Sequence, residues 1–259
     1  MTTALLTDSV TADPARAVRL TLLWGLDAVV LRTVGGARVP DVAEGPLRRR
    51  LEENELPVAG LDPGLFEGSA SARAGWLDDL ARLDDLAPFA RRVGAGLVRV
   101  GALAADDTTD GAAGALRQAG ERAAALGLKL AVRNDVESVI ATGAALAALL
   151  AEADHPALAA DWRPADALVS GEDPEAGLRA LTDADVFIAC VGVRDGKTDG
   201  DWTETVVGEG AVGWGRQLSA LAAAGFDGPL VLEAVPQPVR SAGLSSATAL
   251  IRMTRAAAR

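Results

Sequence analysis

The chain is poor in the residues that most often build metal, redox and disulfide sites. Among 259 residues it has one histidine, one cysteine and no tyrosine. A single cysteine, Cys190, excludes an intrachain disulfide and is typical of a reducing compartment, so we expect a cytoplasmic location. The single histidine, His155, lies in a predicted loop before a strand, where a turn role is expected. This composition excludes the His-rich clusters that hold several zinc ions.

Positive charge is also scarce, with 25 basic against 36 acidic residues and a formal net charge of −11. Such a surface repels polyanions, so we expect neither nucleic acid nor an anionic membrane as a partner. The N-terminus has no basic stretch followed by an apolar one, and no apolar run is long enough to span a bilayer. The sequence therefore predicts a soluble, intracellular protein.

The sequence does contain a regular alternation of short apolar runs and amphipathic segments, and 49% of its residues are hydrophobic. The predicted strands are 4–7, 28–32, 57–61, 97–100, 129–133, 158–162, 186–193 and 230–233. The predicted helices are 13–24, 46–55, 76–93, 111–126, one that ends near 152, one that begins at 173–174, 214–224 and 244–257. Eight such units without a flexible linker predict one (β/α)8 TIM barrel domain over residues 1–259. A doubly wound open sheet is the alternative, but no glycine-rich phosphate loop follows the first strand.

Basic residues recur where the predicted strands end, although the chain as a whole is acidic. In such barrels the reactive groups lie at the carboxyl ends of the strands and in the loops just after them. The basic residues at these positions include Arg133, Arg163, Arg194 and Lys197, and the acidic ones include Asp161, Asp195 and Glu233. The pattern favours a pocket for a small anion. The alternative is that the arginines form a structural network with the carboxylates, because buried charges need partners in any barrel.

Two tryptophans are candidate walls of a ligand pocket. Trp162 ends a predicted strand, and Trp202 lies in the long polar loop over residues 197–214. Their rings could stack on a sugar, and the loop is a candidate lid over the site.

Several segments together resemble one known group of barrels. They are GLDAVVLR (25–32), HPALAADWRPADAL (155–168), GEDPEAGLRAL (171–181), VGVRDGK (191–197) and VGEGAVGWGRQLSALAAAGFDGPLVLE (207–233). This wording resembles the sugar phosphate isomerase/epimerase group of xylose isomerase-like TIM barrels, which also contains the AP endonuclease 2 relatives. The resemblance follows the element order over nearly the whole chain and is strongest in its C-terminal half.

The resemblance implies a divalent metal held by Glu on barrel strand five, Asp on strand six, His on strand seven and Glu on strand eight. Those positions fall here on Arg133, Arg163, Gly192 and Glu233. A guanidinium is permanently protonated and has no lone pair, so neither arginine can bind a metal. We therefore expect a divergent member without a metal or another cofactor.

Two alternatives keep a metal. A shift of the alignment by one residue would make Asp135 or Asp161 a ligand. A carboxylate-only site would consist of Asp161, Asp195 and Glu233.

The resemblance implies a protein that acts on or binds a small sugar, keto-polyol or sugar acid. For an isomerase or epimerase without a metal, we expect Glu233 as the base and Lys197, or alternatively Arg163 or Arg133, as a cation for the enolate oxygen. The predicted ligand-binding residues are Arg133, Arg163, Arg194, Asp161, Trp162 and Trp202. The alternative is a non-catalytic relative, a pseudoenzyme, that binds a small anion or a protein partner. An AP endonuclease is excluded, because it needs a His-rich zinc cluster and an anionic DNA partner.

Overall fold

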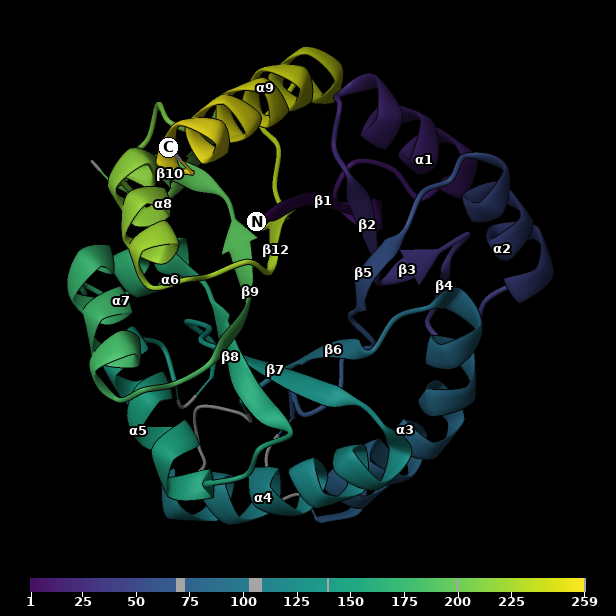
Figure 1. The fold of residues 1–259 in the computed structure, drawn as a ribbon, viewed down its shortest axis with the longest axis vertical. Coiled ribbons are helices and arrows are strands. Elements are labelled where there is room, and N and C mark those ends of the chain that lie inside the picture. The colour runs from purple at the N-terminus through teal and green to yellow at the C-terminus, as the bar shows by residue number, and fades with distance from the viewer. Residues whose placement is uncertain (69–72, 103–108, 139, 199, 259) are drawn as a thin grey trace. The chain divides into compact units, whose positions relative to one another are not determined.

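Eight parallel strands form a closed barrel in the order β1-β12-β9-β8-β7-β6-β5-β2. The structure is a computed structural model that describes residues 1–68, 73–102, 109–138, 140–198 and 200–258. The barrel strands are β1 (Thr2–Leu6), β2 (Ala28–Leu31), β5 (Val58–Leu61), β6 (Leu97–Val100), β7 (Lys129–Arg133), β8 (Leu158–Trp162), β9 (Ile188–Val193) and β12 (Pro229–Leu232). The predicted (β/α)8 TIM barrel is confirmed (Figure 1).

Helices follow the strands along the chain. They are α1 (Pro14–Leu23), α2 (Glu44–Glu53), α3 (Arg73–Val93), α4 (Thr109–Leu126), α5 (Gly143–Ala153), α6 (Pro164–Val169), α7 (Pro174–Asp183), α8 (Trp214–Ala223) and α9 (Val239–Ala257). A 3-10 turn, η1, covers Thr7–Ser9. No helix in the described ranges is long and apolar enough to cross a membrane.

The structure adds short elements that the apolar pattern did not predict. Helix α6 follows β8, and two antiparallel hairpins follow β2 and β9: β3 (Thr33–Val34) with β4 (Ala37–Arg38), and β10 (Asp195–Lys197) with β11 (Thr203–Thr205). Strands of two or three residues are too short to show a periodic pattern. Helix α9 also begins five residues before the predicted 244, because its first turn, VRSAG, lacks the apolar spacing that marked the rest.

The chain divides into two compact units, Met1–Ala59 with Val191–Arg259, and Gly60–Cys190. We call them unit 1 and unit 2 and describe each by itself; the single domain over residues 1–259 stays a prediction. In unit 2, β6, β7 and β8 pair in parallel, with Val100 opposite Val132 and Arg133 opposite Asp161. Helices α3, α4 and α5 lie outside these strands (Figure 1).

The start of α5 is fixed by side chains that satisfy its first amide groups. Thr142 Oγ1 accepts from the Ala145 N–H at 3.1 Å. The Glu172 carboxylate accepts from the Gly143 and Ala144 N–H groups at 2.6 and 3.1 Å. A helix N-terminus exposes unpaired N–H groups and favours negative charge, so these residues determine where α5 begins.

Helices α5 and α7 approach each other through two glycines. A Cβ atom added at Gly143 would lie 2.5 Å from the Gly177 carbonyl oxygen, and one added at Gly177 would lie 2.6 Å from the Trp162 ring. Real Cβ atoms do not come so close to other heavy atoms. The absence of side chains at both positions is therefore what allows α7 to pack on α5 and on the end of β8.

We expect Gly177→Ala to lower the free energy of unfolding by about 1 to 3 kcal/mol, because the added methyl group overpacks this contact. The matched control is Gly114→Ala in α4, where an added Cβ meets nothing within 4 Å. That variant should be about 0.5 to 1 kcal/mol more stable than the wild type, since alanine favours a helix. Urea denaturation measures both; an equally stable Gly177→Ala would show that the contact has room.

Candidate functional site

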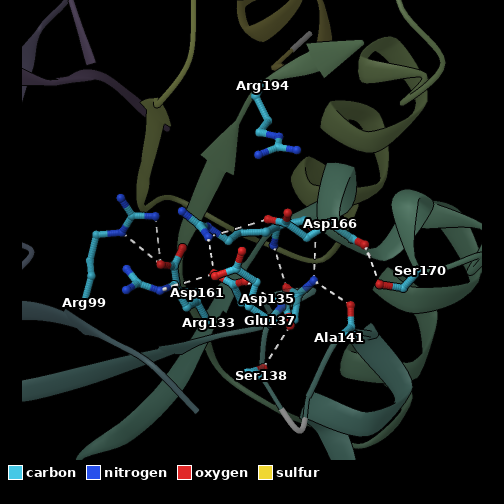
Figure 2. Close-up of polar contacts among 12 residues, drawn as sticks. Arg99, Arg133, Asp135, Glu137, Ser138, Ala141, Asp161, Asp166, Ser170 and Arg194 are labelled. Carbon is cyan, nitrogen blue, oxygen red and sulfur yellow. Dashed lines mark hydrogen bonds and ion pairs between the residues drawn. The ribbon is translucent and has the colours of Figure 1, made fainter. Parts of the chain in front are cut away.

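A buried ion pair joins β6 to β8 inside unit 2. Arg99 Nε donates to Asp161 Oδ2 at 2.9 Å, and Arg99 Nη2 lies 2.8 Å from the same oxygen. Both side chains are completely buried, and Figure 2 shows them pointing toward each other. Asp161, predicted to bind ligand, thus has a fixed cation as its partner. The role of Arg99 was not predicted, because a single arginine inside the apolar strand LVRV gives no indication of the residue that it contacts.

Arg133, at the end of β7, is surrounded by carboxylates. Its Nη1 donates to Asp62 Oδ2 at 3.1 Å, its Nη2 donates to Glu67 Oε1, and its Nε lies 4.0 Å from Asp135 Oδ2. Only 7% of the Arg133 side chain is exposed, and Asp62 is completely buried. The charge of this guanidinium is therefore compensated within unit 2.

Arg163, just after β8, is held through both its side chain and its backbone. Its Nη1 donates to Asp135 Oδ2 at 3.1 Å and lies 3.6 Å from Asp166 Oδ2. The buried side-chain amide of Asn134 donates to the Arg163 carbonyl oxygen at 2.9 Å and accepts from the Arg163 N–H at 2.8 Å. These two hydrogen bonds hold the loop after β7 against the loop after β8.

These contacts help to decide between two interpretations of the arginines at the strand ends, a pocket for a small anion and a structural network of ion pairs. Each of Arg99, Arg133 and Arg163 contacts at least one carboxylate. The carboxylates are Asp62, Glu67, Asp135, Asp161 and Asp166. The five acidic groups outnumber the three guanidinium groups, so this group of residues is not locally positive. The geometry favours the structural network over a purely anion-binding pocket.

In unit 1, Asp195 organises the loop that leads to α8. Its carboxylate is buried and accepts four backbone N–H groups: from Gly196 and Val212 at 3.0 and 3.2 Å, and from Gly208 and Gly210 at 2.8 and 3.1 Å. A Cβ atom at Gly210 would collide with the carboxylate. The glycines of the GEG segment, residues 208–210, therefore have a structural role. They allow the loop to bring its amide N–H groups close to the Asp195 carboxylate.

The β10–β11 hairpin brings two predicted ligand-binding residues together with a third that the pattern missed. Trp202 Nε1 donates to Glu204 Oε1 at 2.8 Å, and Arg194 Nε lies 3.6 Å from the same oxygen. The Arg194 guanidinium also lies over the Trp202 ring, 4.9 Å from its centroid. Gly196 leaves room for that ring, because a Cβ atom there would lie 2.5 Å from it. We call Arg194, Trp202 and Glu204 the hairpin cluster.

The pKa of the Glu204 carboxyl group is raised above its ordinary value. Burial raises the pKa of Glu204, and the negative charges of Asp195 and Glu233 raise it further, whereas the Trp202 hydrogen bond and the Arg194 charge lower it. Its Oε2 is buried and accepts no hydrogen bond from any described residue. The sequence shows only a polar loop here, because burial of Glu204 depends on a hairpin of three-residue strands.

Lys197, predicted to act with Glu233, lies in the same hairpin but is exposed. It is on β10, opposite Thr203 of β11. Its role as a cation for an enolate oxygen stays a prediction.

Glu233 follows β12 and lies directly against Gly192 of β9. A Cβ atom added at Gly192 would lie 2.8 to 2.9 Å from three atoms of the Glu233 carboxyl group. The pairing of Val231 with Gly192 and the hydrogen bond from the Glu233 N–H to the Val193 carbonyl oxygen, 3.0 Å, hold the two strands in this position. The carboxyl group therefore occupies the space that a side chain at 192 would need.

The model of the xylose isomerase-like TIM barrel family matches residues 18–253. The chain belongs to this family. No curated protein matches it.

Solved structures with the same fold include two epimerases and a zinc-containing protein. The chain is similar to an L-ribulose 3-epimerase, with 17% identity, a TM-score of 0.80 and coverage of 99% of this chain and 95% of the other. It is also similar to an IOLI protein with a bound zinc atom, with 14% identity, a TM-score of 0.80 and coverage of 100% and 98%. A D-allulose 3-epimerase from Methylomonas sp., in complex with D-allulose, has 14% identity, a TM-score of 0.73 and coverage of 100% and 94%. At these identities the likeness shows the fold alone.

The residues of this xylose isomerase-like barrel do not fit the metal site that the family implies. Arg133 and Arg163 lie at the ends of barrel strands five and six, where the resemblance implies two of the ligands, and neither has a lone pair to donate. At the strand-seven position Gly192 has no side chain that could bind a metal, and the Glu233 carboxyl group lies against it. Within the described ranges, no group of three or more His, Cys, Asp or Glu is arranged to hold a metal ion. The one histidine, His155, serves a turn, where its Nδ1 accepts from the Ala157 N–H.

Trp162 occupies a core position in this barrel. It is completely buried, and its ring lies where a side chain at Gly177 of α7 would have to fit. Successive side chains of a strand point to opposite faces, so Trp162 points toward the helices while Asp161 points the other way. This geometry favours a packing role over the predicted stacking on a ligand. Trp202, which is only partly buried, remains the candidate for stacking.

We expect Arg99→Met to lower the free energy of unfolding by about 3 to 5 kcal/mol, because it leaves Asp161 buried without this cation. The control is Arg122→Met. Arg122 pairs with Asp84 on the surface, where the two side chains are 47% and 42% exposed, and exposed pairs contribute about 1 kcal/mol or less. Chemical denaturation of both variants measures the difference. Equal losses would show that burial does not distinguish the two pairs.

Proposed function

We propose that this protein is an isomerase/epimerase-like barrel that binds a small sugar, keto-polyol or sugar acid without a divalent metal. The observation that carries the proposal is Arg133, which stands at the strand-five ligand position with its guanidinium against Asp62 and Glu67. A guanidinium has no lone pair to donate to a metal, and this one already engages two carboxylates, Asp62 and Glu67, that could otherwise serve as ligands. The loss of the family metal site is thus part of the proposal.

The sugar class is supported by the relatives and by the residues at the strand ends. Two of the similar structures are a ribulose epimerase and an allulose epimerase with its sugar bound. Arg163 and Arg194 keep 13% and 26% of their side chains exposed. A partly exposed guanidinium can donate to sugar hydroxyl, carbonyl or carboxylate oxygens, and a Trp ring such as that of Trp202 packs on the apolar face of a sugar.

Isomerisation or epimerisation without a metal needs a base and a cation. The base takes a proton from the carbon next to the carbonyl group, the electron pair of that C–H bond moves to form an enolate, and a cation stabilises its oxygen. Delivery of a proton to the other face of the same carbon completes an epimerisation. Delivery to the former carbonyl carbon, with transfer of the hydroxyl proton from its oxygen to the former carbonyl oxygen, completes an isomerisation. Neither reaction involves a net oxidation. Glu233 is the proposed base, and Lys197 or an arginine is the proposed cation.

A non-catalytic relative that binds a small anion or a protein partner is the second candidate. The ion pairs of Arg133 and Arg163 favour it, because a guanidinium that is already neutralised by carboxylates stabilises an enolate oxygen less well. The two candidate functions differ in whether the protein converts a substrate. Neither of them includes a bound metal.

We expect the purified protein to contain well below one equivalent of Mg, Mn, Co, Ni or Zn per chain. Elemental analysis measures the content, and a thermal-shift series with each ion and with EDTA measures the effect on the melting temperature. Without a site, no ion should stabilise the fold and EDTA should not destabilise it. One tightly bound equivalent, lost with EDTA together with stability, would refute the metal-free proposal.

A ligand screen by thermal shift tests the arginines. D-allulose, L-ribulose and D-gluconate at millimolar concentration represent neutral ketoses and a sugar acid. A ligand that raises the wild-type melting temperature should raise that of Arg163→Ala by less than half as much, because Arg163 contributes hydrogen bonds to the ligand. Arg122→Ala, a surface variant, should respond like the wild type. Equal shifts in all three proteins would exclude Arg163 from the site.

A further inference from the structure

We propose that Glu204 is a ligand-binding residue whose buried Oε2 accepts a hydrogen bond from a hydroxyl group of a neutral sugar. The inference rests on the proposed sugar-binding function and narrows it, because it assigns an uncharged, hydroxyl-bearing end of the ligand to the hairpin cluster. The observations that carry it all lie within unit 1.

The first observation is the state of the two carboxylate oxygens of Glu204. Oε1 accepts from Trp202 Nε1 at 2.8 Å and lies 3.6 Å from Arg194 Nε. Oε2 is buried and has no donor among the described residues. Buried polar atoms almost always have a hydrogen-bond partner, so Oε2 is an acceptor that the described residues leave unused.

The second observation is that the carboxylate is held in place rather than free to turn away. The Trp202 ring fits over Gly196, where a Cβ atom would lie 2.5 Å from it, and the Arg194 guanidinium lies 4.9 Å from the ring centroid. Glu204 is directly opposite Gly196 in the hairpin. With Oε1 fixed by Trp202, the direction of Oε2 is fixed as well, as preorganised binding requires.

The third observation is the local charge, which selects the kind of donor. The charged groups that act on Glu204 are Arg194, Asp195 and Glu233, two anions and one cation, and the carboxylate of Glu204 adds a third anion. Arg194 already lies beside Oε1. A ligand carboxylate or phosphate would meet net repulsion here, whereas a hydroxyl group donates to Oε2 without bringing a negative charge.

The test compares binding of D-allulose and L-ribulose with that of D-gluconate by titration calorimetry. In Glu204→Gln, the amide oxygen still accepts from Trp202, but an NH₂ group replaces Oε2 and cannot accept from a hydroxyl. The ketose Kd should therefore rise roughly tenfold or more, since hydrogen bonds to charged groups are the strong ones. Asp201→Asn is the matched control, because it removes an exposed carboxylate three residues away and should leave the Kd unchanged.

A pH series provides a readout that a purely structural role would not change. Burial raises the pKa of Glu204, and the ionised form is the better acceptor. Ketose affinity of the wild type should be full at pH 7.5 and should fall as the pH is lowered through this raised pKa. Glu204→Gln should show no such fall over the same range.

The outcomes separate the two proposals. A wild type that binds neither the ketoses nor D-gluconate overturns the proposed function, and the inference with it. A wild type that binds a ketose with the same Kd and the same pH profile as Glu204→Gln overturns the inference alone. Binding of D-gluconate only, unaffected by Glu204→Gln, also upholds the function and overturns the neutral-sugar assignment.

Discussion

The ion pair between Arg99 and Asp161 is the constraint on which the arrangement of unit 2 depends. Both side chains are completely buried and within 3 Å of each other. Moving either charge out of water costs several kcal/mol, and only a close partner offsets this cost. The pair joins β6 to β8, which are not neighbours in the barrel because β7 lies between them. With Asp161 engaged in this pair, Arg133 and Arg163 have other carboxylates as their described partners, Asp62 and Asp135.

The same requirement, that buried charges have partners, governs the other carboxylates of unit 2. A metal centre would gather carboxylates around one divalent cation, whereas Asp62, Asp135 and Asp161 contact guanidinium groups here. If the metal site is lost, as proposed, these ion pairs balance the buried anions in its place. In unit 1 the Glu233 carboxyl group lies directly against Gly192.

The barrel could be predicted from the sequence because its signals are local. Short apolar runs, separated by amphipathic segments, some with Asp-Pro starts, identify the eight barrel strands and the longer helices without reference to distant residues. The candidate site could be predicted only in part. Arg133, Arg163 and Arg194 are found because they follow strands, but their partners are not, since an ion pair such as Arg133 with Asp62 joins residues 71 positions apart.

Two residues that matter most to the site were missed for different physical reasons. Arg99 lies in a strand of four residues whose neighbours are apolar, so its burial is visible but its contact with Asp161 is not. Glu204 acquires its environment from a hairpin with strands too short for any periodicity. Conversely, Trp162 looks like a pocket residue at a strand end, and only the side-chain alternation along β8 and the glycine at 177 place it against α7.

The loop after β9 has a consequence for how a ligand would gain access to unit 1. Its glycine-rich part converges on one carboxylate, with four amide groups bonded to Asp195. Displacing any one of these amides leaves part of a buried anion unsolvated, so the remaining three bonds resist partial movement. The four bonds therefore tie Gly208, Gly210 and Val212 to the start of β10 at Gly196. If residues 197–214 cover a ligand, this part of the loop stays anchored to the barrel while the ligand enters.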